Sequence, residues 1–375
     1  MSKEYIISTP GHPSIYQYEQ RELKLYFCEP DQGVNEQTGL LLLIPGFGGN
    51  SNSKVYRKMR SAFADKYNLV TVQCDYFGSE FMQGNIYPIK LTARFNEKSN
   101  VITKNDMAQI NNYLKDAVIT KNMYKICEKY NIDLVGYAQL SETLTNFNDM
   151  GIMQALDNIS AVMIVISILK ENNLNFNNNK IIIYGHSHGA YLGYLCNAMA
   201  PNLFKYLIDI SAWLFPAYLN GQRFYISAIN KSKLITFFDY LAGSSQIYDE
   251  ELLNLTYLYK MFSNKCRIIC YHGDADHLVS HKDKKVFSES VNNFIYNEIS
   301  NNSIDGEIFK AANHGLDADF IKLFEYTMNE YITSKNITST HGDSCFSDLP
   351  TITMKTQKHN YIVDYSKNIP IMNMS

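Results

Sequence analysis

The chain has 375 residues, enough to bury the core of one large α/β domain or of two smaller ones. Its 46% hydrophobic and 19% charged residues are ordinary for a soluble globular protein, and its net charge of -3 gives no basic surface for nucleic acid or acidic lipid. Residues 1–9 contain no long apolar segment, and the apolar runs at 40–44 and 161–169 are too short to cross a bilayer. The sequence therefore predicts a cytoplasmic protein with neither a nucleic-acid nor a membrane partner.

The seven cysteines are scattered and odd in number, and several lie inside apolar runs. Cys266 and Cys270 share one strand-like segment, and no second cluster of cysteine or histidine follows with the spacing of a zinc site. This pattern favours buried free thiols and predicts no disulfide framework, no metal and no cofactor.

Short β-branched runs, each followed by a turn and a helical stretch, predict an α/β fold with a mostly parallel sheet covered by helices. The expected strands are residues 5–8, 23–29, 40–44, 69–74, 180–184, 206–210, 268–271 and, more weakly, 307–310. The expected helices are residues 54–66, 152–169, 188–199, 284–297 and 318–331.

Two long stretches, residues 77–150 and 212–265, do not fit this alternation. Compact domains rarely contain long structureless loops, so both are interpreted as inserted lid segments. The predicted organisation is one domain over residues 1–333 with these two insertions, and a tail over 334–375 for which the sequence suggests no role. Within the tail, residues 352–354 and 361–363 are strand-like.

Residues 181–190, IIIYGHSHGA, combine a buried-type strand, the pattern G-x-S-x-G and the start of a helix. A serine at such a sharp strand-to-helix turn is exposed at the carboxyl end of the sheet, and glycines on either side avoid clashes there. Ser187 is therefore the predicted nucleophile, and the backbone N–H of His188 is predicted to form half of an oxyanion hole. His186 and His188 have no third ligand at a helical offset, so a metal site is not predicted at this turn.

A serine nucleophile needs a base to take its proton and an acid to orient that base. Residues 270–279, CYHGDADHLV, end a strand with a turn that carries carboxylates, and His314 lies in a loop just before a helix. His314 is the predicted base. The acid is predicted to be Asp276, with Asp274 and then Asp209 as alternatives.

The order Ser187, Asp276, His314 is that of the α/β-hydrolase superfamily, which the chain resembles from residue 40 to about residue 331. The pattern H-G-x-x-D-x-x-V at 272–279 resembles the acid loop of that family and favours Asp276. Residues 45–49, PGFGG, resemble the family's oxyanion loop, commonly His-Gly-x, with Pro45 in place of the histidine. The resemblance implies that the backbone N–H of Phe47 is the second oxyanion donor.

These features together predict a serine hydrolase that cleaves an ester-like acyl bond on a small molecule or a sugar. An acyltransferase to a sugar hydroxyl with the same three residues, or a non-catalytic binding protein on this fold, are the alternatives. The whole sequence also resembles an uncharacterised bacterial hydrolase-like family associated with flagellin glycosylation loci, which implies an acylated sugar as substrate. The two insertions are expected to roof the site, and the sequence does not predict an oligomeric state.

Overall fold

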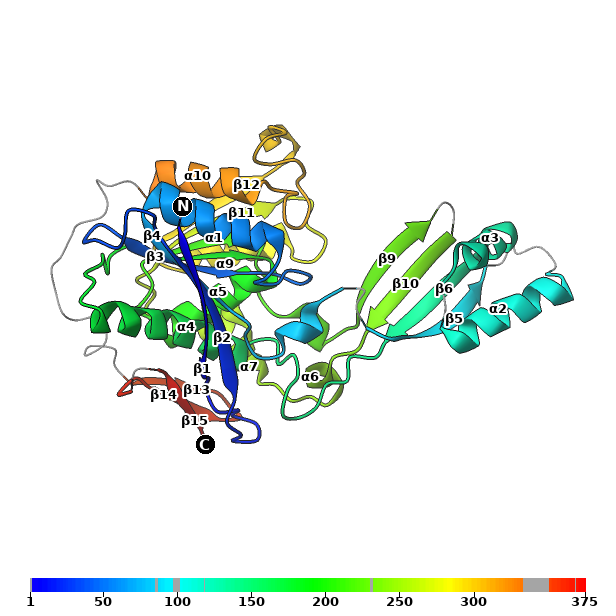
Figure 1. Cartoon of the computed structure of the whole chain (residues 1–375), viewed down its shortest axis with the longest axis horizontal. Helices are drawn as coiled ribbons and strands as arrows, with labels where there is room; N and C mark the ends of the chain where they lie inside the picture. Colours follow the sequence, from blue (N-terminus) through cyan, green and yellow to red (C-terminus); the bar gives the residue numbers. More distant parts are fainter. Residues whose placement is uncertain are drawn as a thin grey trace. The chain divides into compact units, whose positions relative to one another are not determined.

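The computed structural model describes residues 2–84, 87–96, 102–117, 119–229, 232–332, 351–367 and 369–375. The chain forms two compact units (Figure 1). The first, called here the main unit, contains Met1–Met82, Leu144–Ala217 and Tyr248–Ser375. The second, called here the inserted unit, contains Gln83–Thr143 and Tyr218–Ile247.

The main unit is built on an eight-stranded sheet with the order β1-β2-β4-β3-β7-β8-β11-β12. Its strands are β1 (Lys3–Pro10), β2 (Glu22–Glu29), β3 (Gly39–Ile44), β4 (Leu69–Cys74), β7 (Ile181–His186), β8 (Tyr206–Ile210), β11 (Arg267–Gly273) and β12 (Phe294–Ile299). β2 pairs antiparallel with β1 and β4, and all the other pairs are parallel. The central strands β3, β4 and β7 are buried along nearly their whole length because helices cover both faces.

Helices α1 (Lys54–Tyr67) and α10 (Phe320–Tyr331) cover one face of this sheet, where Phe63 stacks on Phe324. Helices α4 (Ile152–Glu171), α5 (His188–Met199) and α9 (His281–Glu289) cover the other face (Figure 1). The predicted mostly parallel sheet with helices on both faces is confirmed. The remaining short helices are η1 (Ser79–Met82), η2 (Ala217–Leu219), η3 (Asn301–Ser303), α6 (Leu241–Ser244), α7 (Glu250–Leu253) and α8 (Leu255–Leu258).

Helix α4 is, among the described residues, the one helix long and apolar enough to cross a membrane. It matches the helix expected at 152–169, and the apolar run at 161–169 lies inside it. In the structure 83% of its apolar window is buried inside the protein, where it contacts α5 and the strands β2, β3 and β4. Its composition is therefore accounted for by its place in the core.

Two expected elements differ from the structure. The segment at 284–297, expected as one helix, is the end of α9 followed by a loop and the first residues of β12, which pairs in parallel with β11. Residues 307–310 are not a strand, because the Asp305 carboxylate accepts hydrogen bonds from the N–H groups of residues 307, 308 and 309 and folds them into a turn.

The inserted unit contains a four-stranded sheet of its own, with the order β5-β6-β10-β9. Its strands are β5 (Ile89–Phe95), β6 (Ile132–Ala138), β9 (Arg223–Ile229) and β10 (Ser232–Phe238), and its longer helices are α2 (Lys104–Asp116) and α3 (Lys121–Tyr130). The two helices pack on one face of the sheet around a core that includes Ile110, Tyr124 and Leu134. Both segments of the inserted unit fall within the two stretches expected as insertions.

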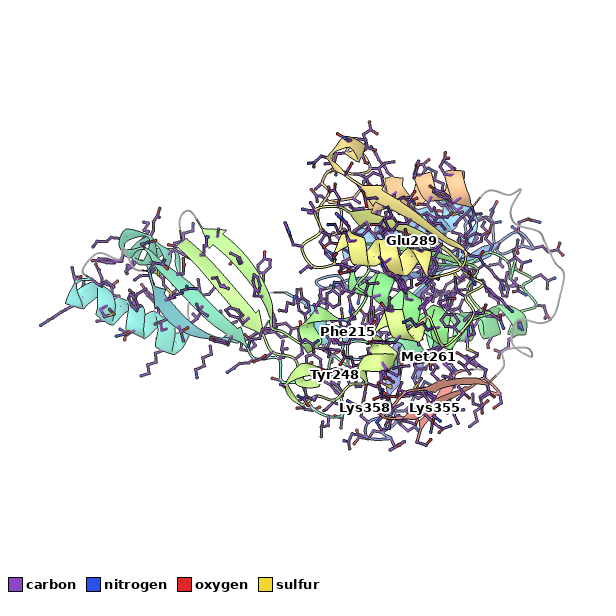
Figure 2. The ribbon with its side chains drawn as sticks, turned by 180° about the vertical axis from the view of Figure 1, so that it is seen from behind. Phe215, Tyr248, Met261, Glu289, Lys355 and Lys358 are labelled. Carbon is purple, nitrogen blue, oxygen red and sulfur yellow. The ribbon has the colours of Figure 1, made fainter. Side chains whose placement is uncertain are left out.

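The tail folds into a three-stranded antiparallel sheet of β13 (Ile352–Lys355), β14 (Asn360–Asp364) and β15 (Ile371–Met374), which belongs to the main unit. The hydroxyls of Thr356 and Tyr361 hydrogen-bond to the buried carboxylate of Asp249. Lys358 donates a hydrogen bond to the Tyr248 carbonyl, and both residues are visible in Figure 2. The tail is thus tied to the main unit by side-chain hydrogen bonds.

The six cysteines at 28, 74, 127, 196, 266 and 270 are buried free thiols, as predicted for them. The seventh, Cys345, lies outside the described residues.

Candidate active site

Ser187 lies between β7 and α5, in the left-handed region at φ 54°. A non-glycine residue at positive φ is strained and is held there by its surroundings. A Cβ on Gly185 would lie 2.5 Å from the backbone of Ala190, and one on Gly189 would lie 2.0 Å from the Ile44 carbonyl oxygen. Both glycines are therefore required for the helix to turn back so closely behind the strand.

Three of the predicted residues form one chain of hydrogen bonds. The Ser187 hydroxyl lies 2.7 Å from His314 Nε2, and His314 Nδ1 lies 2.8 Å from Asp276 Oδ2. Because the carboxylate can only accept, Nδ1 carries the proton and donates it to Asp276. In the neutral imidazole Nε2 then carries a lone pair, and it is placed to accept the hydroxyl proton of Ser187.

The acid loop brings Asp276 and not Asp274 to His314. Asp276 is 8% exposed, and its other oxygen accepts from the N–H groups of Leu278 and Val279. Burial raises the pKa of Asp276, but the hydrogen bond and charge of His314 outweigh burial and hold the pKa below its ordinary value. Asp274 is exposed to solvent at the same turn.

The third candidate acid, Asp209, is engaged elsewhere. It is fully buried at the end of β8, forms an ion pair with Lys284 at 2.8 Å and accepts hydrogen bonds from the Tyr194 hydroxyl and the Ala212 N–H. Lys284 also donates to the Ala212 carbonyl. This pair fixes the segment that follows β8, where the Ile210 carbonyl accepts from the N–H of Ser187.

Ser211 links the same segment to the histidine loop. Its hydroxyl oxygen accepts a hydrogen bond of 3.0 Å from the N–H of Gly315, the residue next to His314. The acid and histidine loops are also joined directly, since the Ala275 N–H donates to the Ala312 carbonyl. Ser211 and Lys284 carry no pattern in the sequence that would identify them, because their roles depend on strands that are neighbours only in space.

The predicted oxyanion loop adjoins the nucleophile. A Cβ placed on Gly46 would lie 3.3 Å from the Cβ of Ser187, so the loop after β3 passes directly beside it. The half-buried ring of Phe47 packs 5.1 Å from the His188 ring and 5.7 Å from the Trp213 ring, measured between centroids. His188 is the first residue of α5, where N–H groups have no acceptor within the helix.

The side chain of His188 is fully buried, and its Nε2 lies 2.7 Å from Gln154 Oε1. The Gln154 amide nitrogen donates to the Phe77 carbonyl, which fixes the amide orientation and makes Nε2 of His188 the protonated nitrogen. Burial lowers the pKa of His188 to about 3, so the ring is neutral at physiological pH. Gln154 is one of several buried polar residues in the first half of helix α4, so its position in the sequence did not single out this contact.

Among the residues that the structure describes, no three His, Cys, Asp or Glu side chains are grouped as metal ligands would be. Within the described part of the chain, His188 and His272 each have one ring nitrogen that is buried without a hydrogen-bond partner.

The strand order, the single antiparallel strand β2 inside an otherwise parallel run, and the serine turn after β7 define the α/β-hydrolase fold. The chain belongs to the family described as "Protein of unknown function (DUF2920)", whose model matches residues 17–339. A comparison with curated proteins gives no match.

Solved structures with a similar fold include Est1E from Butyrivibrio proteoclasticus with ferulic acid bound, which is 15% identical (82% of this chain, 93% of that chain, TM-score 0.45). Esterase 2 from Thermogutta terrifontis, phosphonylated by sarin, is 12% identical (87% and 96%, TM-score 0.44). An alpha-beta serine hydrolase homologue from Coxiella burnetii is 13% identical (88% and 97%, TM-score 0.41). At this identity the likeness concerns the fold, and the link to flagellin glycosylation stays a prediction.

Proposed function

We propose that this protein is a serine hydrolase that cleaves an ester-like acyl bond through Ser187, His314 and Asp276. The observation that carries the proposal is the pair of hydrogen bonds from Ser187 to His314 at 2.7 Å and from His314 to Asp276 at 2.8 Å. A buried carboxylate, an imidazole in a fixed tautomer and a serine held in a strained backbone conformation are what nucleophilic acyl transfer requires.

In the proposed reaction the Ser187 oxygen attacks the acyl carbon while His314 Nε2 takes its proton. Asp276 keeps the imidazole oriented and stabilises the imidazolium that forms. The backbone N–H groups of Phe47 and His188 bind the oxyanion, a contact worth about 3 to 4 kcal/mol for each donor in the transition state. His314 then gives its proton to the leaving alcohol, and water deacylates Ser187 with His314 again as base.

The proposed substrate is a short acyl ester of a small molecule or sugar. The indole of Trp213 and the ring of Phe47 pack together beside the oxyanion loop, and aromatic faces suit a compact acyl group or a sugar ring. A sugar hydroxyl in place of water would make the same residues an acyltransferase, and a cytoplasmic location is part of the same proposal.

The proposal is tested with a fluorophosphonate probe, which reacts only with an activated serine. The parent protein is expected to be labelled at Ser187. In Ser187→Ala we expect no labelling, and the turnover of p-nitrophenyl acetate should fall at least about a thousandfold. Ser366→Ala, at an exposed serine of the tail, is the matched control and should behave as the parent does. A Ser187→Ala variant with parental turnover would remove Ser187 from the mechanism.

The same assay with esters from acetyl to palmitoyl tests the substrate class. We expect the specificity constant to fall as the acyl chain lengthens. A steady rise toward palmitoyl would instead indicate a lipase.

A further inference from the structure

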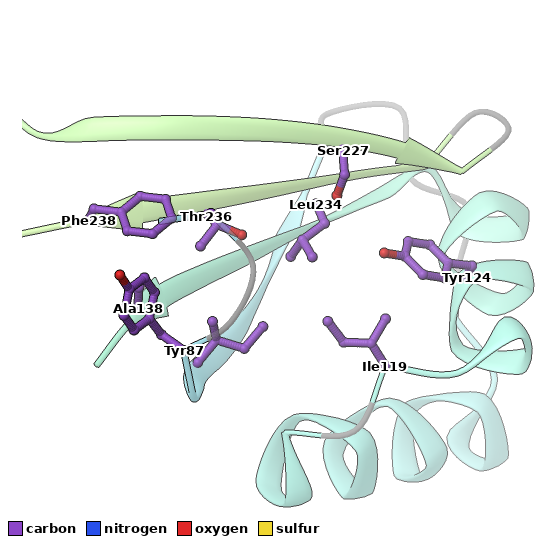
Figure 3. Close-up of a pocket in the computed structure, with 10 residues that line it drawn as sticks. Tyr87, Ile119, Tyr124, Ala138, Ser227, Leu234, Thr236 and Phe238 are labelled. Carbon is purple, nitrogen blue, oxygen red and sulfur yellow. The ribbon is translucent and has the colours of Figure 1, made fainter. Parts of the chain in front are cut away.

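The inserted unit contains a cavity that the proposed reaction does not use. Its volume is about 260 Å³, and all ten residues that line it belong to this unit. Figure 3 shows Leu234, Thr236 and Phe238 of β10 on one side, with Ile119 and Tyr124 on the helical side. We call this space the inserted-unit cavity.

The cavity exists because small residues occupy the helix-facing side of the sheet. On β6 this side carries Leu134, Gly136 and Ala138 in turn, so the side chains become smaller along the strand. The large core residues of α2 and α3 pack over the other end, around Ile132 and Leu134. Space is therefore left over Ala138, and Ile89 and Thr236, whose side chains flank Gly136, also line it.

Gly136 is unusual because a glycine in the middle of a strand weakens it. Such a glycine commonly marks a bulge, a close approach of another backbone, or a close approach of a ligand. The ladder runs through Gly136 without a bulge, since it is paired with Leu91 on one side and Thr236 on the other. A Cβ placed on Gly136 would meet only side-chain atoms, the nearest at 3.5 Å, so no backbone approaches it either. A bulge and another backbone are thus excluded, which leaves the close approach of a ligand or a bend of the strand as explanations of Gly136.

The lining determines the chemistry of that ligand. None of the ten lining residues is Asp, Glu, Lys, Arg or His, so an ionic ligand would be buried without a counter-charge. The walls are aliphatic and aromatic, with the rings of Tyr87, Tyr124 and Phe238 among them. Polar side-chain atoms are few: they are the hydroxyls of Tyr87, Tyr124, Ser227 and Thr236, and the Thr236 hydroxyl lies 3.6 Å from a Cβ placed on Gly136.

We propose that the inserted-unit cavity binds a small uncharged aromatic molecule that carries one hydroxyl group, such as a phenol. An apolar cavity of about 150 Å³ is large enough to bind benzene, so 260 Å³ accommodates a substituted single ring. The ring would pack against Leu234, Ile119 and Phe238. Its hydroxyl would hydrogen-bond to Thr236.

The test is titration of the full-length protein with phenol by isothermal calorimetry, with toluene and benzoate as comparison ligands. Phenol and toluene are expected to bind saturably at one site per chain, and benzoate is expected not to bind because its charge would be unpaired. Ala138→Leu fills the cavity and should weaken the binding of phenol at least about tenfold. Val135→Leu enlarges a neighbouring residue of β6 on the opposite face and should leave the affinity within about twofold.

A second variant separates the hydroxyl contact from the fit of the ring. Thr236→Val keeps the side-chain volume but removes the hydroxyl. It should therefore weaken the binding of phenol about three- to tenfold, while toluene binds as before. Circular dichroism of each variant checks that it is folded. Absence of saturable phenol binding, or unchanged binding in folded Ala138→Leu, would overturn the proposal, as would equal effects of Thr236→Val on both ligands.

Discussion

Asp274 and Asp276 are two residues apart in one turn but lie in opposite environments. Asp276 is buried and bonded to His314, whereas Asp274 is exposed. Asp276→Asn should lower turnover about ten-thousandfold, because an amide can stabilise the wrong imidazole tautomer. Asp274→Asn is the matched control, and we expect turnover within about threefold of the parent. The opposite ranking in an ester-hydrolysis assay would assign the acid to Asp274.

His188 makes stability depend on pH in a defined direction. Its pKa falls from 6.5 in the unfolded chain to about 3 in the folded protein, because burial opposes the charged ring. Above pH 6.5 neither state is protonated there, and as the pH falls below 6.5 only the unfolded state takes up the proton. The folded state is thus destabilised progressively from pH 6.5 toward pH 3.

His188→Met removes this contribution. The parent's advantage in free energy of unfolding over the variant should therefore shrink by about 1.4 kcal/mol per pH unit between pH 6 and pH 4.5. Urea denaturation at several pH values measures the difference. A constant difference across this range would mean that the folded protein protonates His188 as readily as the unfolded chain does.

The three residues of the hydrogen-bonded chain were predictable because each carries a local pattern: Ser187 a glycine-flanked turn, Asp276 a strand-ending carboxylate, and His314 a loop before a helix. Ser211 was not predictable. A serine after a strand is common, and its bond to Gly315 joins residues 104 positions apart. The sheet also separates Asp209 from the candidates Asp274 and Asp276, because it places Asp209 in an ion pair with Lys284.

At the scale of elements, the ion pair between Lys284 and Asp209 joins α9 to the end of β8. Both side chains are fully buried, so removal of one partner leaves the other as an uncompensated charge. Lys284→Met should destabilise the protein by about 3 to 5 kcal/mol in chemical denaturation. The double variant Lys284→Met with Asp209→Asn is expected to be more stable than the single variant. A single variant as stable as the parent would show that Asp209 tolerates burial alone.

The strands β3, β4, β7 and β8 were expected within one or two residues of their observed bounds, because each is a short, mostly apolar run that both helical layers bury. The strand at the edge of the sheet was harder to predict. Strand β12 is covered less completely and reads FIYNEI, which has neither a clear alternation nor a fully apolar run. The sequence therefore predicts a helix that extends across the start of β12, and it places the last strand at 307–310 instead.

At the scale of the whole molecule, the tail contributes two strands where the sequence is strand-like, at 352–354 and 361–363, and contacts that the sequence did not indicate. Its strands are short, but Thr356 and Tyr361 hydrogen-bond to the buried Asp249 carboxylate, and the Met372 N–H donates to His12. Deletion of residues 351–375 should lower the free energy of unfolding by roughly 3 kcal/mol or more, since two bonds to a buried carboxylate are lost.

Tyr361→Phe is the graded control for this deletion. It removes one of the two hydroxyls and should cost about 1 to 3 kcal/mol. Urea denaturation followed by tryptophan fluorescence measures both, because Trp213 is buried in the main unit. An unchanged unfolding midpoint in the deletion would mean that the tail sheet is not part of the cooperative structure.

The inserted unit is made of two segments, and this division constrains the order in which the protein can form during synthesis. Strand β10 lies at the centre of the small sheet, with β6 from the first segment on one side and β9 from the second on the other. While the ribosome is still adding residues 144–217, β5 and β6 have been made but lack the strand that completes their sheet. Their apolar side chains stay uncovered until about ninety further residues have been made, an interval in which exposed strand edges are open to wrong pairing. Early chaperone contacts are therefore expected on the segment at 83–143, before the nucleophile at 187 has a histidine to bond.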